Sequence, residues 1–551
     1  MLEKLQAIFN SFTKREKLSF QIALAVLFIA LIVNGLYIYY TKTSITPKEG
    51  GTFIEGLIGQ PVVINPILSA NNEVDKDLME ILFSDITELA EKYSVSDDHR
   101  TWTIELKDGL KWSDGEPLNG DDVVFTIETI QDPETNSPYT ITWEGVKVEK
   151  INEMEVRFSL KTPYAFFLEN LKTLKIIPKH IFEGIPSANL KLSDYNLEPV
   201  SSGPYAFNGY DRKKIGFIEE YHLSQNEYYI GEKPFIKNLN IKFFSNKSEA
   251  IDAFNHREID GLGSITSSEA KNVKIGHDLL KLDIPRYYAV FFNGSTAPIL
   301  KDKAIREALT KSVDIESVIS EVFDGEAKKV DSPIYPGIEG YDSNLKPTEY
   351  NTEDAKQILD EAGWLENEDG VRTKKLGGEE SKLEFELVVP NIDFLIETAD
   401  RIAKNWESIG IHINLVTLSP SEITGNVIKT RNYDMILFGN ILKGNPDIFS
   451  FWHSSERFHP GLNLAMYENK TVDSLLESIR KNFDGPSREN DIKKLQTLIR
   501  NDFPVVFLYS PTYLYAITKN LGGFDEKLIP SPSNRFDHIE KWYLKTKRVI
   551  K

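Results

Sequence analysis

The sequence predicts a mixed α/β protein of more than one domain, preceded by one membrane-spanning helix. Three observations support this prediction. The chain has 551 residues, which is more than a single hydrophobic core usually serves. Its C-terminal half holds a strand, a helix and a second strand in close succession. An unbroken apolar run lies near the N-terminus.

The composition is that of a folded protein with an acidic surface. Hydrophobic residues make up 41% of the chain and charged residues 27%, as in ordinary globular proteins. The net charge of −19 disfavours contact with a phosphate backbone, so we expect no nucleic-acid partner. The chain has no cysteine, which excludes disulfides, thiolate catalysis and cysteine-ligated metals.

The N-terminal apolar run, residues 18–40, predicts a membrane anchor. It contains no charged residue, and about 23 helical residues at ~1.5 Å each are long enough to cross a ~30 Å hydrocarbon layer. Lys14, Arg15 and Lys17 precede it, so we expect residues 1–17 to be a cytoplasmic tail and the main domain to be extracytoplasmic. A cleaved signal peptide is the alternative, although no small-residue cleavage site follows the run. Residues 41–51, which contain Pro47, are polar and predict a linker.

The region before residue 290 is rich in short strands and turns, as in 101–106, 147–160 and 236–244. The clearest secondary structure lies in the C-terminal half. Residues 301–325 predict one helix or two short ones, ending at Gly325. Residues 351–364 predict a helix with Thr352 as N-cap and Gly363 after its last turn.

The clearest unit is the strand–helix–strand segment between residues 382 and 417. Residues 382–389 and 411–417 alternate polar and apolar side chains, and apolar residues recur at helical spacing over 396–409. The two strands should therefore run parallel with a right-handed crossover. Residues 435–438 predict a further strand of the same sheet, and we expect it to break after Phe438.

Eight segments, in sequence order, together resemble the extracytoplasmic solute-binding proteins, family 5, of peptide and nickel ABC importers. The most specific is 101–130, whose Trp102, Trp112 and Phe125 we interpret as core and whose Asp121 and Asp122 as helix caps. The other matching segments are 201–207, 226–244, 253–261, 285–319, 350–364, 463–478 and 503–517.

The resemblance implies a two-lobed type II periplasmic-binding-protein fold whose lobes are joined by two crossings of the chain. Residues 52–285 would form the first lobe, with an extra α+β subdomain at about 66–195. Residues 286–504 would form the second lobe, and 505–551 would return to the first. Such a fold closes by hinge bending around its ligand.

The resemblance also implies a function. The chain would be the monomeric, membrane-anchored binding component of an ABC importer, capturing peptides or peptide-like solutes and delivering them to permease subunits. It would not be an enzyme. The alternative is a surface-anchored sensor, chaperone or adhesion module that reuses the binding-protein fold.

The family resemblance places the ligand at the strand end formed by Phe438, Gly439 and Asn440. There, an extended peptide would bond to backbone groups, as in β-augmentation. Peptide-binding members carry an aspartate that meets the peptide α-ammonium group, whereas this chain has Asn440, which lacks the charge-assisted term. Asp447, after a short insertion, either replaces that charge or caps the helix after Pro446.

Two aromatic clusters could either line the ligand site or pack in the core. Trp452 follows Phe449 and Phe451, and Tyr164 precedes Phe166 and Phe167. We include Trp452 and Tyr164 among the predicted ligand contacts, with core packing as the alternative for both clusters.

We expect no metal, no cofactor and no catalytic residue. His453 and His459 flank Glu456, but their spacing is loose and fits surface histidines better than ligands. The sequence contains no His-Glu-x-x-His, Gly-x-Ser-x-Gly or phosphate-cradling glycine loop. Because the family includes nickel-binding members, a bound metal complex stays an open alternative.

Overall fold

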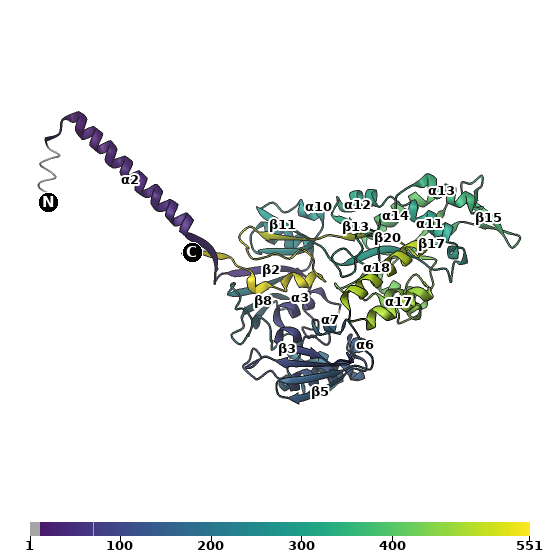
Figure 1. Ribbon diagram of the computed structural model, residues 1–551, viewed down its shortest axis with the longest axis horizontal. Coiled ribbons are helices and arrows are strands. Elements are labelled where there is room, and N and C mark those ends of the chain that lie inside the picture. The colour runs from purple at the N-terminus through teal and green to yellow at the C-terminus, as the bar shows by residue number, and fades with distance from the viewer. Residues whose placement is uncertain (1–10, 70, 551) are drawn as a thin grey trace.

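The computed structural model describes residues 11–69 and 71–550 and has two lobes side by side, with one helix projecting from the first (Figure 1). The lobes are built on two separate sheets, one of seven strands and one of six. This arrangement confirms the predicted two-lobed α/β fold, which solved structures described below share.

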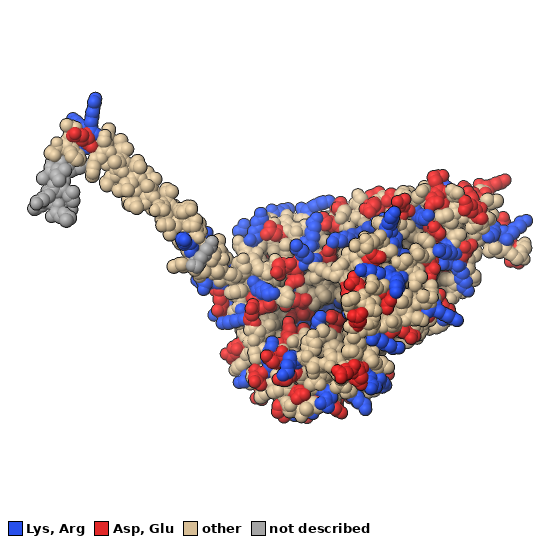
Figure 2. Space-filling model, in the orientation of Figure 1, with Lys and Arg blue, Asp and Glu red and all other residues tan. Residues whose placement is uncertain are grey.

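The projecting helix is α2, Lys14–Lys42, and it contains the predicted anchor. None of its side chains is buried, and among the described residues it is the one helix long and apolar enough to cross a membrane. Thr13 and Glu16 form a capping box at its start. Figure 2 shows that its surface is uncharged between the charged residues at its two ends. Residues 1–10 of the predicted tail lie outside the described residues.

The predicted linker, residues 41–51, is wrong over most of its length. Residues 43–48 form strand β1, Thr43–Lys48, which pairs antiparallel with β22, Lys545–Ile550. β-Branched residues suit an extended strand, but the partner lies some 500 residues away along the chain, where local patterning cannot identify it.

The seven-stranded sheet of the first lobe takes strands from both ends of the chain. Its order is β11-β21-β10-β2-β9-β8-β7, and β2 runs parallel to β9 and β10. The strands are β2 Thr52–Ile58, β7 Tyr205–Arg212, β8 Ile218–Gln225, β9 Asn238–Phe244, β10 Gly261–Ile265, β11 His277–Leu282 and β21 Tyr513–Thr518. The main helices of this lobe are α3 Glu73–Leu82 and α9 Lys247–Asn255.

A four-stranded antiparallel sheet with the order β3-β4-β6-β5 extends the first lobe. Its strands are β3 Ala90–Val95, β4 Thr101–Leu106, β5 Lys147–Asn152 and β6 Glu155–Ser159, and α5, Gly120–Gln131, lies among them. Trp102 and Trp112 are buried, as predicted, whereas the cap of α5 is Asn119, with Asp122 as the reciprocal member of a capping box.

The six-stranded sheet of the second lobe has the order β13-β20-β12-β19-β17-β18. Its strands are β12 Arg286–Phe292, β13 Ala327–Lys329, β17 Glu384–Pro390, β18 His412–Leu418, β19 Met435–Ile441 and β20 Val505–Pro511. Its main helices are α11 Lys303–Lys311, α12 Ile315–Phe323, α13 Thr352–Glu361, α14 Asp393–Glu407, α17 Lys470–Lys481 and α18 Gly485–Asp502. A small sheet of β14 Leu365–Glu366, β15 Arg372–Leu376 and β16 Glu379–Lys382 lies at its far end.

The elements predicted in the second half are largely confirmed. β17, α14 and β18 form the strand–helix–strand unit, and its strands are parallel over their whole length. The 301–325 segment is two helices. The cap of α13 is Asn351 rather than Thr352, because the Asn351 side chain accepts from the Asp354 backbone N–H.

The chain passes twice between the lobes. The first crossing, residues 283–285, joins β11 to β12, and the second, Thr512, joins β20 to β21. β20 pairs with β12 and β13, so the chain returns to the first lobe after Pro511 rather than at residue 505. The Ser510 hydroxyl donates to Ile284 O (3.0 Å), which ties the two crossings together.

The predicted break after Phe438 is wrong. β19 continues to Ile441, and its pairing with β12 holds through Asn440↔Tyr287 and Ile441↔Arg286. Gly439 therefore lies inside a strand. The loop that contains Gly444 and Pro446 follows only after Leu442.

Candidate functional site

The predicted ligand-binding strand ends at the carboxyl edge of the second-lobe sheet. β17, β18 and β19 run parallel, so their C-terminal ends lie along the same edge. In open α/β sheets, ligands bind outside the carboxyl ends of the strands. Phe438, Gly439 and Asn440 occupy this position on β19.

The end of β19 is paired on one side only. Its ladder with β17 consists of Leu387↔Met435 and Val388↔Ile436, whereas β17 itself continues along β18 as far as Pro390↔Leu418. On the opposite side, β12 stays paired with β19 through Ile441. From Leu437 onward, β19 thus has an edge with which no strand of the described chain pairs.

The backbone of Gly439 points to this open edge. The N–H of Leu442 donates to Pro285 O (2.8 Å), and Asp434 O accepts from the N–H of Asn293 (2.8 Å). Because hydrogen-bonding direction alternates along a strand, the even-numbered residues of β19 bond to β12, while Gly439 and Ile441 face away from it. Their N–H and C=O groups are therefore placed to accept an added strand.

Glycine at position 439 is explained by its cross-strand neighbour. A Cβ on Gly439 would come within 2.9 Å of the ring of Tyr288, its partner on β12. The Tyr288 ring packs beside Phe394 and Tyr509 on that face of the sheet. A side chain at 439 would displace this ring.

Asn440 is buried and hydrogen-bonded inside the second lobe. Its side chain is 3% exposed, and its Nδ2 donates to the hydroxyl of Tyr287 (2.9 Å). Tyr287 is fully buried, and burial raises its pKa, so its hydroxyl is neutral. The end of β19 therefore offers a polar but uncharged pair where the family resemblance implied a carboxylate.

Both carboxylate oxygens of Asp447, the residue considered as a replacement for that charge, have partners within the chain. Arg480 Nε donates to them at 2.9 and 3.0 Å, and the hydroxyl of Tyr164 donates to Oδ2 (2.7 Å). The Phe449 N–H also donates to Oδ1 (3.2 Å), but the N-cap of the short helix α16, Phe449–Trp452, is Ile448, which makes no side-chain capping bond.

Tyr164, Asp447 and Arg480 form a contact between the two lobes, which we call the interlobe latch. Tyr164 follows β6 in the first lobe, whereas Asp447 and Arg480 belong to the second. The N–H of Ala165 donates to Arg480 O (2.7 Å), and the Arg480 guanidinium lies 4.0 Å from the ring centroid of Phe449. Burial, followed by the charge of Asp447, raises the pKa of Tyr164, so the latch tyrosine stays protonated and keeps donating.

Of the two aromatic clusters, Trp452 packs in the core. Its side chain is fully buried, with ring centroids 5.9 Å from Tyr467 and 6.0 Å from Phe507. Phe449 and Phe451 are half-buried at its margin. Trp452 thus lies beneath the β19 end and supports it, together with Tyr287.

Sequence reasoning missed Tyr287 and Arg480. Tyr287 belongs to an apolar strand in which it looks like any core aromatic residue, and Arg480 is one of many charged residues on an amphipathic helix. Nothing in their local patterns distinguishes them. Only the register of β12 on β19 and the approach of the first lobe give them their partners.

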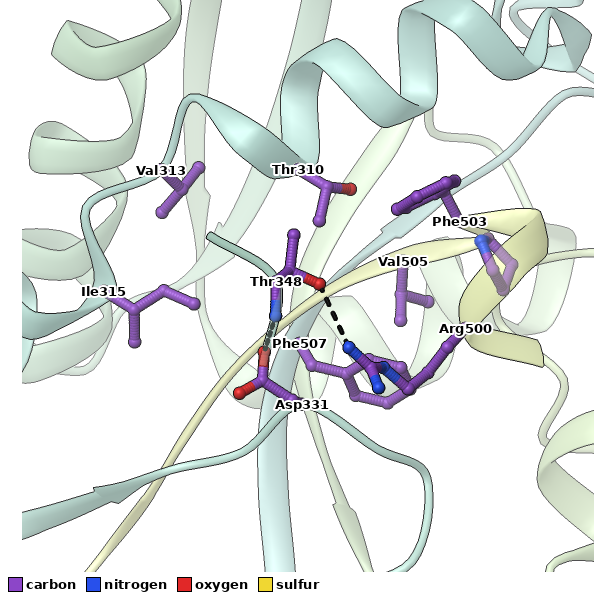
Figure 3. Close-up of a pocket in the computed structure, with 10 residues that line it drawn as sticks. Thr310, Val313, Ile315, Asp331, Thr348, Arg500, Phe503, Val505 and Phe507 are labelled. Atoms are coloured by element: carbon purple, nitrogen blue, oxygen red, sulfur yellow. Dashed lines mark hydrogen bonds between the residues drawn. The ribbon is translucent and has the colours of Figure 1, made fainter. Parts of the chain in front are cut away.

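A small cavity in the second lobe is not the ligand site. It measures about 20 Å³ and is enclosed by α11, the start of β20 and the end of α18 (Figure 3). Arg500 there donates to Thr348 Oγ1 (3.4 Å), and the Thr348 N–H to Asp331 Oδ1 (3.4 Å). A space of this size fits about one water molecule and is too small for a solute.

No described part of the chain gathers three or more side chains that could hold a metal ion. His453 stacks on Phe449 with its ring centroid 4.1 Å away, and its Nδ1 faces the hydroxyl of Ser455 (2.8 Å).

Comparisons with known proteins identify the family to which this chain is similar. The family model described as "Bacterial extracellular solute-binding proteins, family 5 Middle" matches residues 86–458. The oligopeptide-binding protein AppA of Bacillus subtilis is 28% identical over 521 residues, covering 91% of this chain and 93% of AppA. The probable D,D-dipeptide-binding periplasmic protein DdpA of Escherichia coli is 25% identical over 459 residues, covering 79% of this chain and 81% of DdpA.

Solved structures share the fold. The ABC transporter substrate-binding protein CtaP of Listeria monocytogenes aligns with a TM-score of 0.77 at 27% identity, covering 90% of this chain and 100% of that chain. AppA of Bacillus subtilis, solved with a nonapeptide, aligns with a TM-score of 0.71 at 27% identity, covering 91% of this chain and 100% of that chain.

Proposed function

Because the chain belongs to the family 5 bacterial extracellular solute-binding proteins, we propose that it captures peptides or peptide-like solutes outside the cell and delivers them to an ABC permease. It works as a monomer, held at the cell membrane by α2 as a single-pass anchor. It makes and breaks no covalent bond, and it uses no cofactor.

The observation that carries this proposal is the open edge at the end of β19. An extended peptide needs a row of unpaired backbone donors and acceptors, and Gly439 and Ile441 present such a row. Backbone bonding of this kind is independent of the peptide side chains, so the edge suits a receptor for many sequences.

Asn440 and Asp447 refine the proposed ligand. The buried pair of Asn440 and Tyr287 is neutral, and Asp447 is neutralised by Arg480. The second lobe therefore lacks a free carboxylate for an α-ammonium group at this point. We propose that the ligand is held chiefly through its backbone, with Phe438, Gly439 and Asn440 as its contacts on β19.

Backbone N-methylation tests the role of the edge. A methyl group on one peptide nitrogen removes a donor and adds bulk at the strand interface without changing the side chains. Scanning a bound peptide with single N-methyl residues should weaken binding at alternate positions, because only every second residue faces β19. Calorimetry that shows equal tolerance at all positions would contradict strand addition.

A further inference from the structure

β1 and β22 form a separate two-stranded sheet where α2 leaves the first lobe (Figure 1). We call residues 43–48 and 545–550 the terminal ribbon. Its six residue pairs run from Thr43↔Ile550 to Lys48↔Lys545, and within the described chain no third strand joins it. Two-stranded sheets are only marginally stable in water. We therefore expect the ribbon to pack against another surface.

One face of the ribbon is a cluster of lysines. Lys48 and Lys545 lie directly opposite each other, and Lys547 is the next residue of β22 on the same face. Like charges in opposed positions repel. Across residues 11–69 and 71–550, no acidic side chain forms an ion pair with any of the three. This basic face stands out in a chain whose net charge is −19.

The opposite face carries two exposed isoleucines and meets the aromatic end of α2. Ile45 is 60% exposed and Ile550 is 85% exposed. Between them, the Arg548 guanidinium lies 4.5 Å from the ring centroid of Tyr40 and 5.3 Å from that of Tyr39, and it donates to Thr43 Oγ1 (3.1 Å). This face is therefore continuous with the last turn of the apolar helix.

We infer that the terminal ribbon lies on the outer surface of the membrane and binds anionic lipid headgroups. Its isoleucines and the helix tyrosines enter the interfacial layer, which aromatic and apolar side chains favour. Its lysines lie on the other face, and their long flexible side chains extend past the edge of the ribbon to the headgroup phosphates. This inference rests on the proposed anchor. It adds that β22 clamps the end of the chain to the exit of α2, so that the binding domain is held in one orientation to the membrane.

The absence of cysteine makes the inference directly testable with a single label. The full-length chain carrying Ile45→Cys, coupled to an environment-sensitive fluorophore, is placed in lipid nanodiscs of phosphatidylcholine with or without phosphatidylglycerol. The control label is at Ile215→Cys, since Ile215 is 86% exposed at the tip of the β7–β8 hairpin. A triple variant, Lys48→Gln, Lys545→Gln and Lys547→Gln, removes the basic face.

The Ile45→Cys label should emit at shorter wavelength than the control and be quenched by bromine-labelled lipid. Both effects should grow with phosphatidylglycerol. The growth should vanish in the triple variant, and at about 1 M salt, where the Debye length is about 3 Å. A spectrum equal to that of the control overturns the inference, and so does a response indifferent to anionic lipid.

The same nanodiscs separate this inference from the proposed function. Peptide affinity is measured on the unlabelled chain and on the triple variant. If peptide affinity is retained but the Ile45→Cys label is exposed to water, only the ribbon inference is overturned. A chain that binds no peptide, yet shows the lipid response, overturns the proposed ligand and supports the ribbon. If the chain does not associate with the lipid nanodiscs, the proposed anchor and the ribbon inference are both overturned.

Discussion

Asn440 fills the position at the end of β19 where the resemblance implied a carboxylate, and its amide is hydrogen-bonded to a buried tyrosine. A neutral hydrogen bond to a ligand ammonium group is weaker than a charge-assisted one. In the proposed site, Asn440 would therefore bind a free amino terminus less tightly than an aspartate would. One substitution tests this proposal.

Asn440→Asp should strengthen binding of peptides with free amino termini. The Tyr287 hydroxyl can turn to donate to the new carboxylate, which leaves one oxygen for the ligand. A charged partner adds about 1 kcal/mol over a neutral one, or roughly fivefold in affinity. Calorimetry with matched free and N-acetylated peptides should show the gain only for the free form. Asn445→Asp adds the same charge in the following loop and serves as control. Unchanged or weaker binding would count against this position as the anchor.

Glu55 is a second residue whose surroundings could not be predicted from the neighbouring sequence. It is fully buried on β2, where it pairs with Arg535 Nη2 (2.9 Å) and accepts from the hydroxyl of Tyr515 (2.8 Å). Burial raises its pKa from 4.5 to about 7, against the opposing charge of Arg535. Arg535 also pairs with the buried Asp77, so one guanidinium group contacts two carboxyl groups.

This raised pKa predicts a pH dependence of stability. Between about pH 4.5 and 7, the folded chain holds a proton on Glu55 that the unfolded chain has lost, so stability falls as pH rises through this window. The contribution is at most about 1.4 kcal/mol per pH unit. Urea denaturation at about pH 5 and about pH 7.5 should show a smaller loss for Glu55→Gln than for the natural chain. Glu105→Gln, at a half-exposed ion pair, is the control. Equal losses in all three proteins would refute the assignment.

At the scale of elements, the interlobe latch joins the extra subdomain to the second lobe. Tyr164 and Asp447 lie 283 residues apart in the chain, and their bond forms only when the two lobes lie together. The latch therefore favours the arrangement seen here over one with the lobes apart.

Tyr164→Phe should shift the protein toward separated lobes. A hydrogen bond to a charged group contributes roughly 1.5–3 kcal/mol, so ligand affinity should fall about tenfold or more. Small-angle scattering of the unliganded protein should show a larger radius of gyration. This measurement separates a latch from a direct ligand contact, which would leave the free protein unchanged. Tyr93→Phe, on half-exposed Tyr93 of β3, is the matched control and should alter neither quantity.

Elements with strong local periodicity could be predicted from the sequence. The spacing of apolar residues indicates the buried face of β17, α14 and β18. The parallel pairing of the two strands follows from the order of these elements in the chain. β1 and the continuation of β19 past Phe438 could not be predicted, because their partners, β22 and β12, are distant in sequence. Glycine after Phe438 looks like a break, and only Tyr288 opposite it explains glycine inside a strand.

In the whole molecule, two short crossings of the chain join the seven-stranded and the six-stranded sheets, and the segment that follows α2 pairs with residues 545–550 in the terminal ribbon. The lobes and their order could be expected from the family resemblance. The side-chain contacts at the candidate site could not be predicted from the sequence, because Asn440–Tyr287 and Tyr164–Asp447 join residues of different elements or lobes. A ligand held by backbone groups also leaves little side-chain signature in the sequence.

Native mass spectrometry of residues 43–551, purified from the host, tests whether this chain is a peptide receptor. This fragment lacks α2 but keeps β1, and with it the terminal ribbon. We expect the protein to carry a mixture of short peptides, which an added peptide library exchanges. A protein that is empty and stays empty with that library, or that carries a ligand without a peptide backbone, would contradict it.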